Sequence, residues 1–153
     1  MSQAFADFAT PFPYLPWQTV LVRLLLATAL GGIIGFEREA RDKPAGLRTH
    51  MLISLAACVF ALLAIGLMEI EGRGDHLRTD PLRLIEAVTA GVAFLAAGTI
   101  LKSDDKVKGL TTGAGMWMAG AIGLACGVGE AALAILGTAV ALMVLFVLKY
   151  VER

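Results

Sequence analysis

The chain has 153 residues, which is enough for one domain. Hydrophobic residues make up 58% of it, against about 45–50% in soluble domains, and its mean hydropathy is +0.76. The formal net charge is zero, so no overall field favours nucleic acid or a strongly charged partner. We therefore expect an integral membrane protein whose main partner is the lipid bilayer.

The apolar residues gather into five runs, each close to the roughly 17–25 residues that a helix needs to cross a bilayer. Residues 1–16 precede them, and three prolines and several aromatic residues there predict a non-helical segment in the headgroup region. The fold class that we predict is all-α, a polytopic membrane domain at residues 17–150. Its helices are expected at residues 17–34, 49–67, 81–101, 110–126 and 130–148.

An internal repeat relates the first pair of helices to the second. Shifting the sequence by 63 positions gives six identities in sixteen residues, among them Gly35 on Gly98 and Gly46 on Gly109. The pattern predicts two parallel hairpins followed by a final helix, unless the match is due to chance.

The basic residues indicate an orientation. With the amino terminus outside, nine Lys and Arg residues fall on the inner side and three on the outer side. Short cytoplasmic loops carry such an excess, so we expect the amino terminus outside and the carboxyl terminus in the cytoplasm.

Two charged residues fall within the predicted helices, Arg23 in the first and Glu86 in the third. The repeat places them at the same depth, and charges at such a depth are costly unless they are paired or hydrated. An ion pair between them is expected, either as a structural link or as the lining of a pathway. Snorkelling of either side chain is the alternative.

Polar residues at the inner ends of the helices form a second candidate site. Glu37 closes the first helix and could attract cations, and the Thr residues that open later helices could cap them or hold an anion. A solvated boundary and simple capping are the alternatives. The candidates are Glu37, Arg48, Thr49, His50, Gly98, Thr111 and Thr112.

No spacing specifies a metal site, although Glu37 and Glu86 are carboxylates that could contact a metal. No set of nucleophile, base and orienting residue is present either. We therefore expect no catalytic residues and no enzymatic activity.

At these residues the sequence resembles the MgtC/SapB family of bacterial inner-membrane proteins, over about residues 21–148. The match rests on five segments in order. They are residues 31–39 (GGIIGFERE), 45–50 (AGLRTH), 80–83 (DPLR), 94–100 (FLAAGTI) and 109–112 (GLTT). Two departures are Ala93 and Ala96, where the family usually has glycine, and the soluble carboxyl-terminal domain of longer members, which is not found here.

The resemblance implies a role in magnesium homeostasis in the bacterial inner membrane, with Mg²⁺ transported or sensed and no cofactor. Two functions remain open. One is a magnesium or small-ion transporter, which would be a homodimer or larger homo-oligomer because five short helices scarcely enclose a hydrated path. The other is a regulatory subunit that binds another membrane protein, such as the ATP synthase.

Overall fold

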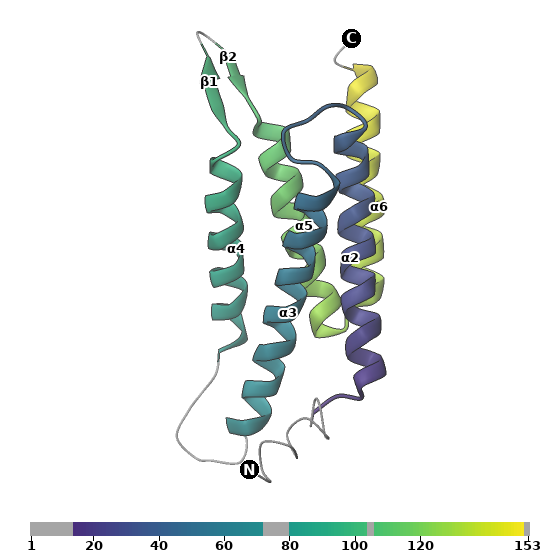
Figure 1. Ribbon diagram of the computed structural model, residues 1–153, viewed down its shortest axis with the longest axis vertical. Coiled ribbons are helices and arrows are strands. Elements are labelled where there is room, and N and C mark those ends of the chain that lie inside the picture. Colours follow the sequence, from purple (N-terminus) through teal and green to yellow (C-terminus); the bar gives the residue numbers. More distant parts are fainter. Residues whose placement is uncertain (1–13, 72–79, 104–105, 152–153) are drawn as a thin grey trace.

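The structure is a computed structural model that describes residues 14–71, 80–103 and 106–151. Within these residues it contains five helices (Figure 1), whose bounds are α2 Trp17–Glu39, α3 Leu47–Glu71, α4 Pro81–Ala97, α5 Leu110–Val128 and α6 Ala131–Val151. Three of them, α2, α3 and α5, are long and apolar enough to cross a bilayer, and α6 contains a shorter apolar stretch, Ala131–Val147. The prediction of a helical membrane protein is confirmed.

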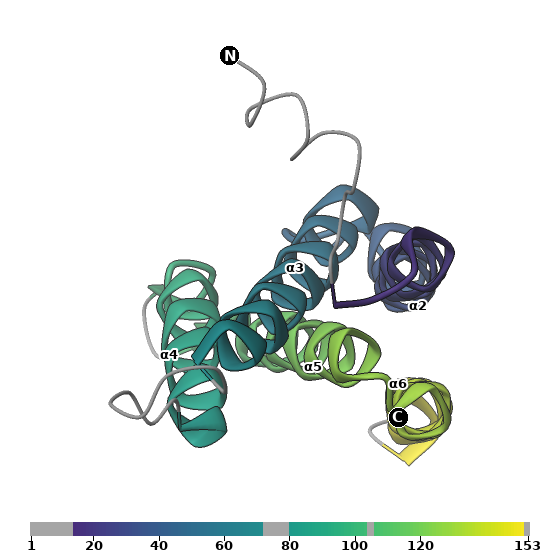
Figure 2. The same ribbon diagram turned by 90° about the horizontal axis from the view of Figure 1, so that it is seen from below.

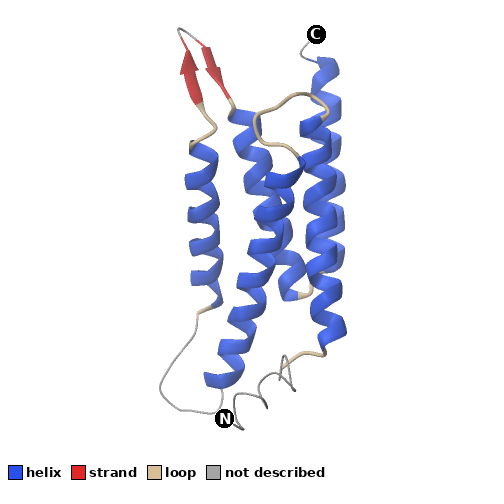
Figure 3. Ribbon diagram, viewed as in Figure 1, coloured by secondary structure: helices blue, strands red, loops and turns tan. Residues whose placement is uncertain are grey.

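Several helix boundaries differ from the predicted ones. Helix α2 continues to Glu39, past the expected end at Ile34, because its charged last turn is buried against the bundle instead of forming a loop. Helix α4 ends earlier than expected, at Ala97. The expected loop after it contains a short antiparallel hairpin of β1 (Leu101–Ser103) and β2 (Lys106–Lys108), drawn in red in Figure 3. Most of the amino-terminal segment, residues 1–13, lies outside the described residues.

The two hairpins of the repeat run in the same direction. In Figure 1, α2 and α4 both ascend and α3 and α5 both descend, after which α6 ascends again. Seen along the bundle in Figure 2, α3 and α5 occupy the centre, α4 lies on one side, and α2 and α6 lie on the other. Helix α6 packs on α2 and α5, and α4 packs on α5 and α3. Consequently α2 has three helical neighbours, whereas α4 has two.

Glycine lets the central helices approach closely. A methyl group built on Gly31 of α2 would lie 2.6 Å from Cβ of Ser54 on α3, and one on Gly127 of α5 would lie 2.7 Å from the carbonyl oxygen of Cys58. Such distances leave no room for a side chain, so the backbones themselves are in contact. In lipid, where the hydrophobic effect does not drive helices together, this close packing provides much of the association energy.

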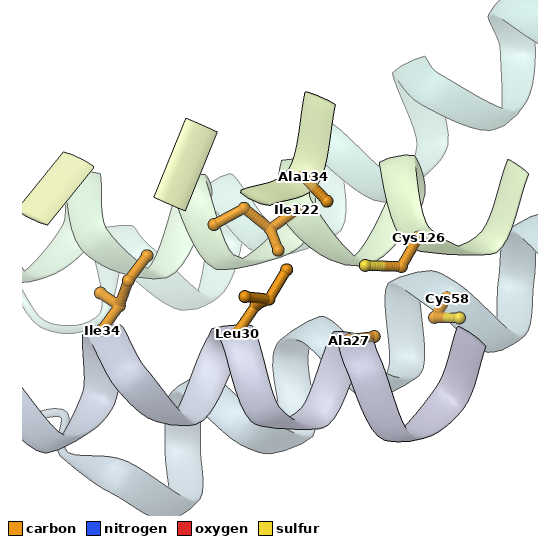
Figure 4. Close-up of a cluster of buried hydrophobic side chains, with 7 residues drawn as sticks. All are labelled: Ala27, Leu30, Ile34, Cys58, Ile122, Cys126 and Ala134. Atoms are coloured by element: carbon orange, nitrogen blue, oxygen red, sulfur yellow. The ribbon is translucent and has the colours of Figure 1, made fainter. Parts of the chain in front are cut away.

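Small apolar side chains fill the space between these contacts. One buried cluster joins α2, α3, α5 and α6 (Figure 4), and a second joins α3, α4 and α5. The first consists of Ala27, Leu30, Ile34, Cys58, Ile122, Cys126 and Ala134. Ser54 crosses between helices as well, since its hydroxyl donates a 2.8 Å hydrogen bond to the carbonyl oxygen of Ala27.

Candidate functional site

A buried group of charged side chains lies where the last turn of α2 meets the first turn of α3. Glu37 and Arg38 are only 6% and 3% exposed, and His50 is fully buried. Charged residues are almost never buried to this extent unless they are paired. We call Glu37, Arg38, Arg41 and His50 the buried polar cluster.

Two arginines from the same helix neutralise Glu37. Nε of Arg41 lies 2.6 Å from one carboxylate oxygen, one helical turn further along, and Nη1 of Arg38 lies 3.6 Å from the other. Arg41 also reaches α6, where it donates a 3.3 Å hydrogen bond to the carbonyl oxygen of Leu145 and lies over the ring of Phe146. The cluster therefore links α2 to the last helix of the bundle.

His50 occupies a pocket built by glycine. Its Nδ1 lies 2.9 Å from the carbonyl oxygen of Gly46, which fixes Nδ1 as the donor. A methyl group on Gly35 of α2 would lie 3.0 Å from Cβ of His50, and one on Gly115 of α5 would lie 3.1 Å from Nε2. The imidazole thus fits between three helices only because glycine stands at both positions.

The polar atoms of the cluster keep unused hydrogen-bonding capacity. Among the described residues, neither carboxylate oxygen of Glu37 accepts a hydrogen bond of good geometry, although both lie within ion-pair distance of an arginine. Nε of Arg38 and Nε2 of His50 have no partner there either. Buried polar atoms are normally satisfied, so a water molecule or another polar group would find both donors and acceptors at this end of the bundle.

The other predicted inner residues divide into two groups. Thr112, near the start of α5, is buried at 2% exposure, and Thr49 is half-buried. Arg48, Thr111 and Gly98, which follows the last turn of α4, are exposed. Of the predicted inner candidates, only Glu37 and His50 belong to the buried polar cluster.

The structure does not bring Arg23 and Glu86 together, which corrects the expected ion pair. Nη1 of Arg23 donates a 2.7 Å hydrogen bond to the carbonyl oxygen of Gly127 at the end of α5. Glu86 lies on the exposed surface of α4, on the other side of the central helices (Figure 2). The two residues face different neighbours because equal depth in two repeats does not fix the side of the helix on which each residue lies.

The sequence reasoning missed Arg38 and Arg41 as site residues. The spacing of Glu37 and Arg41 is the i, i+4 spacing at which a Glu and a following Arg meet on one helix face. That signal was available, but it required α2 to continue past Ile34. The described residues contain no group of three or more His, Cys, Asp or Glu side chains that could hold a metal ion.

Comparison with known proteins identifies the family. The model of the MgtC family matches residues 24–153. This chain belongs to the MgtC family. The prediction from the sequence motifs is therefore confirmed, and the match includes all five helices, beginning inside α2.

Three relatives illustrate the range of this MgtC family member. The chain is 41% identical to "Putative magnesium transporter YhiD" of Escherichia coli K12, over 82% of this chain and 58% of that protein. It is 40% identical to "Protein SapB" of Bacillus subtilis, over 72% of this chain and 48% of that protein. It is 35% identical to "Protein MgtC" of Salmonella typhimurium LT2, over 78% and 45% respectively.

The chain thus spans about half the length of these three relatives. No solved structure matches it.

Proposed function

We propose that this MgtC family member serves magnesium homeostasis in the bacterial inner membrane as a regulatory membrane subunit. Family membership and the similarity to a protein named a putative magnesium transporter support the link to magnesium. In this proposal the end of the bundle that carries Glu37 faces the cytoplasm, in agreement with the excess of Lys and Arg in the loops of that side.

The observation that carries the regulatory role is the closed interior of the bundle. Mg²⁺ gives up its hydration water reluctantly, so a path for it must hold water as well as the ion. Between α2, α3 and α5, glycine backbones instead touch the neighbouring helices, as at Gly31 and Gly127. Arg23, which could have lined a path, is bonded to the Gly127 carbonyl oxygen.

The buried polar cluster supports the same proposal. Its charges balance one another, since Glu37 lies between two arginines, and one of these is tied to the backbone of α6. A cation-binding vestibule needs carboxylate oxygens that face the ion without a competing positive charge. The cluster is better suited to hold α2, α3 and α6 in one arrangement at the cytoplasmic end, where a partner could read it.

A transporter formed by several copies of the chain is the second candidate. The name of the E. coli relative favours it, and in such an assembly the path would run between chains instead of through one bundle. This candidate requires flux that depends on the assembly.

Flux measurements separate the two functions. Purified protein is reconstituted into liposomes that contain a Mg²⁺-sensitive dye, with a known magnesium channel as the positive control. We expect influx equal to that of protein-free liposomes over a panel of divalent and monovalent ions. Influx that disappears in Glu86→Gln, while the fold is intact, would overturn the regulatory proposal in favour of transport.

A growth assay tests the link to magnesium independently. In a strain that lacks its own copy of the gene but keeps its magnesium transporters, we expect this chain to restore growth at low magnesium. We expect Glu37→Ala not to restore it. In a strain without magnesium transporters, the chain alone should give no rescue, and rescue there would again favour the transporter.

A further inference from the structure

Helix α4 has an exposed face that the described part of the chain does not cover. Its buried residues, Val88, Val92 and Ala96, form one stripe that faces α3 and α5. Helix α6 covers the corresponding helix of the first repeat, α2, but lies on the far side of the bundle from α4 (Figure 2). One repeat therefore has its outer helix covered and the other does not.

The uncovered face carries a regular pattern. Exposed charged and small residues recur at alternating spacings of three and four along α4, which is the spacing of the a and d positions of a coiled coil. They are Arg83, Glu86, Ala90, Ala93 and Ala97. We call this set the α4 seam. Alanine at such positions permits the close backbone approach on which helix association in lipid depends.

The two charges in the seam lie at membrane depth. Glu86 precedes Gly98 at the inner end of α4 by twelve residues, or about 18 Å of helix, while α5 beside it is about 28 Å long. Glu86 thus lies roughly 10 Å inside the outer end of α5. A carboxylate exposed to lipid at that depth costs several kcal/mol unless something pairs with it. Within the described residues, neither Glu86 nor Arg83 forms an ion pair.

We propose that the α4 seam is the contact between two copies of this chain, arranged as a parallel two-fold dimer. In such a pair each a-position side chain packs into a hole that includes the neighbouring d position of the other helix. Arg83 and Glu86 are adjacent a and d positions, so each Arg83 meets the other copy's Glu86. The two-fold axis repeats this contact, and the seam is self-complementary in charge.

The alanines complete the interface further into the bilayer. Ala90, Ala93 and Ala97 would face their own counterparts across the axis, with no side chain large enough to separate the helices. The positions that resemble the family but lack its usual glycine thus include Ala93 of the seam. Arrangement about α4 leaves the buried polar cluster of each copy on α2 and α3, away from the contact.

Cysteine cross-linking in native membranes tests the dimer. Cys58 and Cys126 are replaced by alanine, and single cysteines are then introduced by Ala90→Cys, Ala93→Cys or Ala97→Cys. Ala87→Cys is the matched control, because Ala87 is also an exposed alanine of α4 but lies in the groove beside α3. We expect a disulfide-linked species of twice the chain mass from the seam variants and little from Ala87→Cys.

A charge exchange tests the pairing. Arg83→Glu and Glu86→Arg each place like charges across the axis, and we expect either to weaken dimerisation roughly tenfold, measured by energy transfer between labelled copies in liposomes. The double variant restores both pairs with reversed polarity and should recover most of the loss. Recovery requires direct pairing and is not expected from a residue with a purely structural role.

Three results would overturn the dimer. Monomers throughout the seam panel would mean that lipid covers this face, and cross-linking to a protein of another mass would mean that a different partner does. Equal cross-linking at Ala87 and Ala93 would mean random collision. None of these results bears on ion flux in liposomes, so failure of the dimer and failure of the proposed function are distinguishable.

Discussion

The outer helices of the two repeats, α2 and α4, are related in sequence but differ in their surroundings. Helix α2 packs on α3, α5 and α6 and buries charged side chains at its end, whereas α4 packs on α5 and α3 alone and exposes its charges. The position of Arg23 in the first repeat corresponds to Glu86 in the second. One is bonded inside the bundle and the other is exposed, so the environment of a repeated position depends on which neighbours cover it.

The comparison is tested most strongly by removing a carboxylate from each region. Glu37→Ala leaves Arg38 and Arg41 buried beside each other without a counter-charge, and breaking a buried pair in this way costs about 3–5 kcal/mol. Glu86→Ala should change the stability of the single chain little, because Glu86 is exposed. The free energy of unfolding, measured by titration with SDS and circular dichroism, gives both values.

A loss of similar size in both variants would contradict the difference between the two helices. Glu37→Gln serves as a further control, since it keeps the shape of the side chain and removes only its charge.

Glycine substitutions sharpen the same contrast. A methyl group on Gly31 of α2 would lie 2.6 Å from Cβ of Ser54, whereas one on Gly91 of α4 meets no atom within 4 Å. Overpacking of this kind costs about 1–3 kcal/mol, so Gly31→Ala should destabilise the chain. Gly91→Ala should be neutral or stabilise it by up to about 1 kcal/mol through helix propensity. The SDS titration measures both, and a destabilising Gly91→Ala would show that α4 is packed more tightly than its exposure indicates.

The starts of the two helices differ as well. The side chain of Asp80 accepts a 2.9 Å hydrogen bond from the Leu82 amide and caps α4, whereas α2 has no side-chain cap. We expect Asp80→Ala to cost about 1 kcal/mol and to increase hydrogen exchange in the first turn of α4 above all. Asp80→Asn, which retains the cap, should behave like the original chain. Equal exchange in the alanine variant would mean that packing, and not the cap, holds this end.

The smallest expected effect concerns the hydrogen bond between Ser54 and the Ala27 carbonyl oxygen, which links α3 to α2. Bonds between helices in membranes contribute about 0.6 kcal/mol on average. Ser54→Ala should reduce the unfolding free energy by that amount. Thr89→Ala is the control, because the hydroxyl of Thr89 bonds within its own helix to Ile85. An unchanged stability in Ser54→Ala would assign the α2–α3 contact to packing alone.

The sequence by itself determined the helices, their approximate limits and the direction of the two hairpins. Long apolar runs separated by charged loops can only form membrane-spanning helices, because lipid offers no partner for free backbone groups. The ordered motifs also determined the family. Helix ends were less accurate, as at α2, because a buried charged turn looks like a loop until its neighbours are known.

Only the tertiary structure decided which charges meet. Arg23 bonds to a carbonyl oxygen of α5 instead of Glu86, and Glu37 is enclosed by arginines that follow it in the same helix. Depth follows from counting residues along a helix, but the neighbours of a side chain depend on helix rotation and packing. Those are set by glycine contacts between segments far apart in the chain, such as Gly35 with Leu47 and Gly127 with Cys58. The placement of α6 on α2 rather than on α4 was decided in the same way.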